Sequence, residues 1–363
     1  MKITNVKTLK VEVPLQKPMI TAIHKTESVG CVLVCIETDT GLVGENYVFA
    51  LNKDRLVVFE AMIKSLTQFL IGQDPMYVEK IWEQMWVDCN PVGQKGISVS
   101  AISAIDTALW DLIGKQANMP LYQLFGACRD KTKAYASSGL WLSASIDELI
   151  EEAHGFIEQG FRSVKLRIGK QDPREDVARA KALRGAIGDD IEILTDANQS
   201  LTARQAIALA RQLEDLNIGW LEEPVPAHDL AGHARILEAI NIPVASGETD
   251  YTRFGMKDIL DSGAVDILMP DLQRIGGLSE FRKSVALASA YNVPISTHIF
   301  TEQSLSIAGS AANCISVEHV DWFAPLFNEA MQIEDGHILM PEGPGLGFTF
   351  DYEFIDRHLF NAS

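Results

Sequence analysis

Short runs of β-branched and apolar residues alternate with amphipathic helical segments across residues 130–325, and this alternation constrains the fold more than any other feature. Eight runs are strand candidates: KAYASS, RSVKLRI, IEILTDA, GWLEEP, IPVASGE, VDILMPD, VPISTHI and SVEHV. Segments such as IDELIEEAHGFIEQG lie between them and have helical periodicity. Eight near-continuous apolar strands alternating with helices close most naturally into a TIM-type parallel barrel. An open doubly wound sheet is the alternative, but no Gly-rich phosphate turn follows the first strand.

Segments with other patterns flank this α/β region. Residues 1–60 alternate in the manner of a β-meander, with a turn at Thr40-Gly41, and residues 55–127 have helical periodicity. The last residues are rich in Gly and Pro, and we expect them to fold back onto the N-terminal part. The predicted parts are an N-terminal α+β unit (1–128), the barrel (129–325) and a C-terminal segment (326–363).

Charge and cysteine content narrow the possible partners. The 363 residues carry a formal net charge of −18, which argues against a nucleic-acid partner and means that an anionic ligand needs a local cationic site. Five scattered cysteines without metal-knuckle spacing are typical of reduced thiols in a cytoplasmic protein. The first residues do not read as a signal peptide, and we expect no apolar stretch near the roughly 20 residues that cross a bilayer. We therefore expect a cytoplasmic protein with a small-molecule ligand and no membrane partner.

Three carboxylates end consecutive strand candidates at 26-residue intervals: Asp196, Glu222 and Glu248. One strand, one loop and one helix occupy about this length, so the three side chains converge at one end of a parallel barrel. Like charges a few Å apart raise one another's pKa unless a cation lies between them. Hard oxygen ligands suit Mg²⁺ or a similar divalent ion. Any one of the three can instead be a helix N-cap, but three in register favour a cation site.

Polar residues also follow most of the other strand candidates, at the end of a barrel where active sites are built. A lone histidine is more often a satisfied core residue, but Asp271 one strand before His298 favours a catalytic histidine whose second nitrogen is free for proton transfer. In strand order, these residues are Lys165 and Arg167, then Asn198, Asp271, His298 and Glu318.

The motifs together resemble the enolase superfamily, in its mandelate racemase/muconate lactonizing enzyme branch, over essentially the whole chain. The resemblance is carried by SAISAIDTALWDLIGK, KLR, TDAN, WLEEP, SGE, MPDLQRIGG and STHIF. It implies an N-terminal α+β capping domain, completed by the C-terminal segment, on a (β/α)7β barrel. It also implies homo-oligomerisation.

The resemblance further implies roles for individual residues. Mg²⁺ would be held by Asp196, Glu222 and Glu248. His298 would be the general base or acid, Asp271 would orient it, and Glu318 would hydrogen-bond the substrate carboxylate. A divalent ion stabilises charge that develops when a proton is removed next to a carboxylate, and a cationic Lys165 adds to this.

Arg167 departs from the family's racemases, which have a second lysine at this position. A guanidinium has a pKa above about 12 and is a poor base, whereas racemisation needs a base on each face of a planar intermediate. Elimination needs one base and an acid, and His298 can serve in both roles. We therefore expect a Mg²⁺-dependent dehydratase of an acid sugar, an aldonate or aldarate, that yields a 2-keto-3-deoxy acid. The alternatives are a racemase, epimerase or cycloisomerase of a small carboxylate, and a non-catalytic barrel.

Polar residues in the N-terminal unit are candidate contacts for substrate hydroxyls. His24 lies where the family's flexible lid falls, and Tyr47 belongs to the second capping loop, so both are predicted to contact substrate. The same segments also contain Thr21, Lys25, Asn52 and Lys53.

Overall fold

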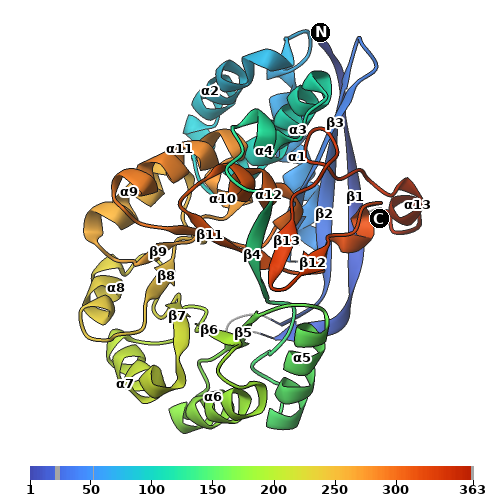
Figure 1. Ribbon diagram of the computed structural model, residues 1–363. Coiled ribbons are helices and arrows are strands. Elements are labelled where there is room, and N and C mark those ends of the chain that lie inside the picture. The colour runs from blue at the N-terminus through green and yellow to red at the C-terminus, as the bar shows by residue number, and fades with distance from the viewer. Residues whose placement is uncertain (21–24, 52, 361–363) are drawn as a thin grey trace.

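The computed structural model describes residues 1–20, 25–51 and 53–360, and a closed barrel of eight parallel strands forms its centre (Figure 1). Each strand pairs with the next in sequence, and the last pairs with the first through the register Val317↔Ala134, which closes the barrel. The strands are β4 (Lys131–Ala136), β5 (Ser163–Arg167), β6 (Glu192–Asp196), β7 (Ile218–Glu222), β8 (Val244–Ser246), β9 (Ile267–Leu268), β10 (Ile295–Thr297) and β11 (Cys314–His319). The predicted (β/α)7β barrel is confirmed, and each predicted strand run overlaps one of these strands.

Helices connect the strands on the outside of the barrel, as right-handed parallel connections require. Two of these helices begin at a capping box that the local sequence provides. Ser145 and Glu148 form one at the start of α5, and Thr202 and Gln205 form one at the start of α7. The helices are α5 (Ile146–Glu158), α6 (Pro173–Ile187), α7 (Ala203–Leu213), η5 (Glu214–Leu216), α8 (Leu230–Leu237), α9 (Thr252–Ser262), α10 (Leu272–Ile275), α11 (Leu278–Ala290) and α12 (Thr301–Ser310).

The capping domain packs a three-stranded antiparallel meander against helices, as predicted. Its strands are β1 (Ile3–Ile20), β2 (Lys25–Thr38) and β3 (Val43–Ala50). Its helices are η1 (Lys53–Arg55), α1 (Leu56–Leu66), η2 (Thr67–Phe69), η3 (Pro75–Tyr77), α2 (Val78–Asp88), η4 (Asn90–Val92), α3 (Ile97–Ala117) and α4 (Leu121–Leu124).

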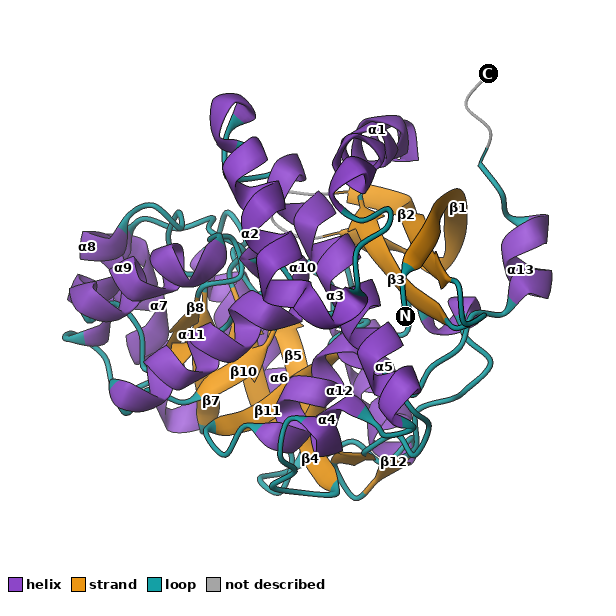
Figure 2. Ribbon diagram, turned by 90° about the horizontal axis from the view of Figure 1, so that it is seen from above, coloured by secondary structure: helices purple, strands orange, loops and turns teal. Residues whose placement is uncertain are grey.

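Helix α3 lies between the cap sheet and the barrel, near the centre of the view in Figure 2. By length and hydropathy it could cross a membrane, so the expectation of no such apolar stretch was wrong. However, 89% of its apolar window is buried inside the protein, which is typical of a core helix.

Buried hydrogen bonds fasten α3 to the barrel. The Asp106 carboxylate accepts from the Ser279 amide at 2.9 Å and from the Ser279 hydroxyl at 2.6 Å. The chain approaches closely here: a side chain on Gly277, whose φ is +93°, would meet an Asp106 oxygen 2.4 Å away. The Ser103 hydroxyl donates to the Leu272 carbonyl at 2.9 Å. These bonds fix the cap over the barrel end that carries the predicted site.

The C-terminal segment contacts both units. It comprises η6 (Ala324–Leu326), β12 (Ile333–Glu334), β13 (His337–Leu339) and α13 (Tyr352–Arg357). Strand β13 pairs antiparallel with the barrel strand β4, whereas Leu359 pairs with Val11 of the cap sheet. The segment packs on the N-terminal part, where Phe327 lies against Tyr47 and Leu359 pairs with Val11, and β13 adds a contact with the barrel. All five cysteines are free in the structure.

We expect Asp106→Ala to lower the free energy of unfolding by about 2–4 kcal/mol, because it leaves the buried Ser279 amide without an acceptor. Urea unfolding at pH 7 measures the change. Asp88→Ala, at the exposed end of α2, is the matched control and should change stability by less than about 0.5 kcal/mol. Equal effects of the two substitutions would contradict this assignment.

Candidate active site

A cavity of about 490 Å³ lies between the C-terminal ends of the barrel strands and the cap. Its size is in the range typical of small-molecule sites. The barrel contributes its charged wall, and the cap contributes Phe49, Phe59 and Ile97 to the facing wall. Most of the predicted site residues line this cavity: Lys165, Arg167, Asp196, Asn198, Glu248, Asp271, His298 and Glu318.

Lys165 is the centre of a buried charge cluster at the bottom of the cavity. Its ammonium nitrogen lies 2.5 Å from a Glu318 oxygen, 2.9 Å from Glu222 and 3.6 Å from Asp196, and its side chain is 1% exposed. Burial and the neighbouring Arg167 act to lower the pKa of Lys165, but the three carboxylates outweigh them and raise it. Among these carboxylates, Lys165 therefore keeps its proton at neutral pH and is a fixed cation.

The carboxylates at the ends of β6, β7 and β8 carry more negative charge than the lysine balances. Burial raises the pKa of Glu222 well above its usual value, and burial together with Glu223 raises the pKa of Glu248 to about 7. Oxygen donors with unfavourable mutual repulsion suit a hard divalent cation. Among the described residues no three such side chains are already spaced for a metal ion. The donor chemistry therefore fits Mg²⁺, but binding requires the side chains to move from their contacts with Lys165.

His298 and Asp271 form a buried pair at the adjacent ends of β10 and β9. The His298 Nδ1 lies 2.7 Å from an Asp271 oxygen, and its Nε2 lies 3.3 Å from Glu248. Burial acts to lower the pKa of His298, but Glu248 and Asp271 raise it to about 9. Asp271 also caps α10 by accepting from the amides of Gln273 and Arg274. The Asp271 carboxylate thus caps a helix and also orients His298.

Arg167 is buried, with 5% of its surface exposed, and its guanidinium stacks 4.8 Å from the Trp141 ring. One terminal nitrogen (Nη2) donates to the Ser137 hydroxyl at 3.0 Å, and the other (Nη1) lies 3.2 Å from Asp196. The Nε and Nη1 atoms have no hydrogen-bond acceptor within the described structure. Arg167 is therefore a held cation with spare donors beside the cavity.

Glu318, predicted to hydrogen-bond the substrate carboxylate, and Asn198 both line the cavity. One Glu318 oxygen accepts from Ser137 and Lys165, and the other accepts from the Ile299 amide. Burial acts to raise the pKa of Glu318, but nearby cations, Lys165 above all, outweigh burial and lower it. An ionised carboxylate cannot donate to a substrate carboxylate, so Glu318 is better suited to holding Lys165. Asn198 donates to Asp196 through its amide nitrogens at 2.7 and 3.1 Å, and its side-chain oxygen is unpaired.

The predicted contacts from the cap are not supported where the structure describes them. Tyr47 is fully buried among Phe300, Phe323 and Phe327 and does not line the cavity, so its prediction as a substrate contact is wrong. Tyr47 is on the same face of β3 as the cavity-lining Phe49, but it lies two residues earlier in the strand and is enclosed in the apolar cluster. Lys53 pairs with Glu12 at 2.9 Å. His24, with Thr21 and Asn52, lies outside the described residues.

Sequence reasoning missed Ser137 and Trp141, which hold Arg167. Both follow the first barrel strand, whose end carries no charged residue to draw attention, although a hydroxyl at a strand end was a usable signal. Glu223, which follows Glu222 at the end of its strand candidate, is also a member of the cavity wall, and Gln199 and Thr249 hydrogen-bond both of its oxygens.

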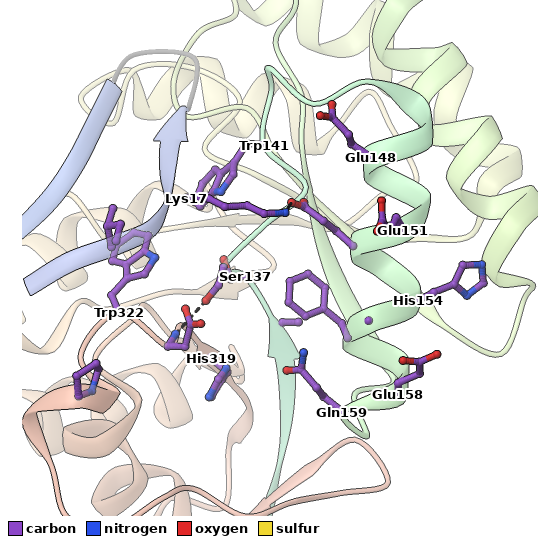
Figure 3. Close-up of a pocket in the computed structure, with 18 of the residues that line it drawn as sticks. Lys17, Ser137, Trp141, Glu148, Glu151, His154, Glu158, Gln159, His319 and Trp322 are labelled. Atoms are coloured by element: carbon purple, nitrogen blue, oxygen red, sulfur yellow. Dashed lines mark hydrogen bonds and ion pairs between the residues drawn. The ribbon is translucent and has the colours of Figure 1, made fainter.

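A larger cavity, of about 710 Å³, lies beside the first, between helix α5 and the end of β1 (Figure 3). Trp322 lines both cavities. Two acidic side chains of this larger cavity have structural partners: Glu148 closes the capping box of α5, and Glu152 pairs with Lys17 at 2.9 Å. Asp196, Glu248 and the His298–Asp271 pair line the smaller cavity, which we take as the active site.

Two family models match the chain. Residues 3–126 match the mandelate racemase/muconate lactonizing enzyme N-terminal domain, and residues 148–354 match the enolase C-terminal domain-like family. The chain belongs to the mandelate racemase/muconate lactonizing enzyme family of the enolase superfamily. The resemblance inferred from the sequence motifs is thereby confirmed.

Members of this family with assigned activities are similar over most of the chain. An L-talarate/galactarate dehydratase of Salmonella typhimurium is 33% identical over 95% of this chain and 85% of its own length. A 3,6-anhydro-α-L-galactonate cycloisomerase of Streptomyces coelicolor is 35% identical over 90% of each chain. The crystal structure of L-talarate dehydratase from Polaromonas sp. JS666 with Mg and L-glucarate superposes with a TM-score of 0.92 at 32% identity, covering 99% of this chain and 98% of that one.

We expect His298 to titrate near pH 9 in protein stripped of divalent ions, and Asp271→Asn to lower that pKa because it removes an anionic partner. The pKa of His298 in the folded protein lies above its ordinary value of about 6.5. Protonated His298 therefore stabilises the folded state fully below pH 6.5, and this stabilisation is lost as the pH rises through 9. Histidine NMR measures the titration, with His154→Gln, on exposed α5, used to assign signals. A wild-type midpoint at 6.5 or below would contradict the pairing.

Proposed function

We propose that this protein is a Mg²⁺-dependent acid-sugar dehydratase. The observation that carries the proposal is that the described cavity wall offers one imidazole base, His298, while Lys165 holds its proton and Arg167 occupies the neighbouring position on β5. One base is enough for elimination but not for two-base racemisation. The dehydratase relatives at about one-third identity support the same reaction class.

Asp196, Glu222 and Glu248 are the residues that would hold the magnesium ion. When bound there, Mg²⁺ would supply electrostatic stabilisation of the negative charge that develops on the substrate carboxylate, by several kcal/mol as a rough estimate for metal Lewis acids. The similar talarate dehydratase structure contains Mg, which supports this assignment. If Glu248 binds Mg²⁺, its negative charge no longer acts mainly on His298. Because Glu248 does most to raise the pKa of His298, this binding would lower that pKa and favour the neutral imidazole.

The protein groups then divide the reaction between them. Neutral His298 takes the proton from the carbon next to the carboxylate through Nε2, and Asp271 stabilises the resulting imidazolium through Nδ1. Lys165, held by Glu318, supplies fixed positive charge to the developing enolate. The imidazolium then returns its proton to the departing β-hydroxyl, so water leaves and the enol product tautomerises to a 2-keto-3-deoxy acid. The spare Arg167 donors are available to hydrogen-bond the substrate hydroxyls.

A cycloisomerase is the second candidate, because a relative of that activity is 35% identical. Isomerisation begins with the same proton abstraction, so the two candidates share the cluster around Lys165 and differ in whether a β-hydroxyl is lost. Cytoplasmic location and assembly of several copies are further proposals of this account.

We expect the Mg²⁺-loaded protein to convert at least one acid sugar into a 2-keto-3-deoxy acid, and His298→Asn to lower kcat by at least about 1,000-fold, as removal of a general base and acid does. A carbonyl reagent measures the product from a library of aldonates and aldarates. His337→Asn, distant in the β12–β13 hairpin, is the control and should retain activity. Deuterium incorporation from D₂O with inversion and no keto acid would instead identify a racemase or epimerase.

A further inference from the structure

One charged side chain of the cap lines the active cavity and has no part in the proposed reaction. Arg55 ends the short η1 turn and directly precedes α1. Within the described chain it has neither an ion-pair nor a hydrogen-bond partner. Lys53, in the same turn, is by contrast held by Glu12. Arg55 is therefore a free guanidinium beside the cavity.

The rest of the described cap wall is uncharged. Its large members are Met19, Phe49, Leu51, Phe59 and Ile97. Arg55 itself is exposed, so its guanidinium is open to a ligand, and a ligand that covers the apolar side chains around it lowers the local dielectric and strengthens the ionic contact. A single guanidinium in such surroundings favours an oxyanion, because its planar N–H donors match the two oxygens of a carboxylate.

The cations on the barrel side already have partners. Lys165 contacts Glu222 and Glu318, and Arg167 contacts Asp196 and Ser137. Arg274 donates to the Glu248 carbonyl at 3.0 Å and lies 3.9 Å from its carboxylate. Arg55 is thus the one cation of the described cavity wall without an anionic partner. The net charge of −18 disfavours anions at long range, so a second carboxylate on a ligand would need a cation of its own.

We propose that Arg55 binds a second carboxylate at the far end of the substrate, so that the substrate class is the aldarates, which are sugar diacids, and not the aldonates. This inference rests on the proposed function, in which the reacting carboxylate lies at the barrel end of the cavity beside Lys165. The opposite end of an extended six-carbon chain then faces the cap. A terminal carboxylate meets the guanidinium there, whereas the terminal hydroxymethyl of an aldonate leaves it uncompensated.

The test compares acids that differ only at the far end: galactarate with galactonate, and glucarate with gluconate. The variants are Arg55→Gln, Arg55→Lys and, as a control, Lys64→Gln, which removes a cation paired with Glu60 in α1. We expect the wild type to prefer the diacid of the better pair. Arg55→Gln should lower kcat/KM for that diacid by at least about tenfold, mainly through KM, because it removes a charge-assisted contact remote from the reacting carbon. Its effect on the monoacid should be less than about threefold, Arg55→Lys should retain part of the preference, and Lys64→Gln should have no effect.

Calorimetric binding of galactarate and glucarate to the Mg²⁺-loaded protein gives a readout that is independent of turnover. Weaker diacid binding in Arg55→Gln, without dehydration of any acid by the wild type, would support the inference and reject the proposed function. Dehydration with equal effects of Arg55→Gln on both members of a pair would reject the inference and keep the proposed function. Failure of the wild type to bind either diacid, or a preference for monoacids, would also overturn the assignment of Arg55.

Discussion

The buried ammonium group of Lys165 is the interaction on which the arrangement of the site depends. Three carboxylates from three different strands lie within 3.6 Å of it, and none of the four side chains is more than 2% exposed. Such a cluster is stable only when its charges are balanced, because an unpaired buried charge costs several kcal/mol. The parallel barrel makes the balance possible, since it brings strand ends that are distant in sequence to one place. Removing the lysine would leave carboxylates that burial and mutual repulsion push toward protonation.

Several residues of the site combine a structural role with a chemical one. Asp271 caps a short helix and orients His298, and Ser137 donates to Glu318 while it accepts from Arg167. The second cation, Arg167, is further fixed by the stacked Trp141 ring. These shared contacts restrict the side-chain rotations of the barrel wall. Its charged and polar groups are therefore oriented before a substrate binds. The cap, by contrast, contributes mostly apolar surface to the described cavity wall, and Arg55 is the one cation of that wall without an anionic partner.

The sequence predicted the barrel and most of its charged wall, because both depend on short-range patterns. The 26-residue intervals between Asp196, Glu222 and Glu248 reflect the length of a β/α unit, and each residue ends its own apolar run. Side-chain direction in the cap was not predictable in this way. Tyr47 is on the apolar face of β3, whereas Arg55 reaches the cavity from an irregular turn whose geometry has no sequence period. The family resemblance added the roles of His298 and Asp271, but not the partners of Arg167, because those come from the loop after β4.

The central claim is that Asp196, Glu222 and Glu248, the first two of which contact Lys165, form a site for one divalent cation. Calorimetric titration of metal-free protein with Mg²⁺ tests it most directly, with Glu222→Gln and, as a control, the exposed Glu158→Gln of α5. We expect the wild type and the control to bind one Mg²⁺ per chain. The Kd for Mg²⁺ should rise by at least about tenfold in Glu222→Gln, because a carboxylate ligand is lost. Unchanged Mg²⁺ binding by Glu222→Gln, or no binding by the wild type, would contradict it.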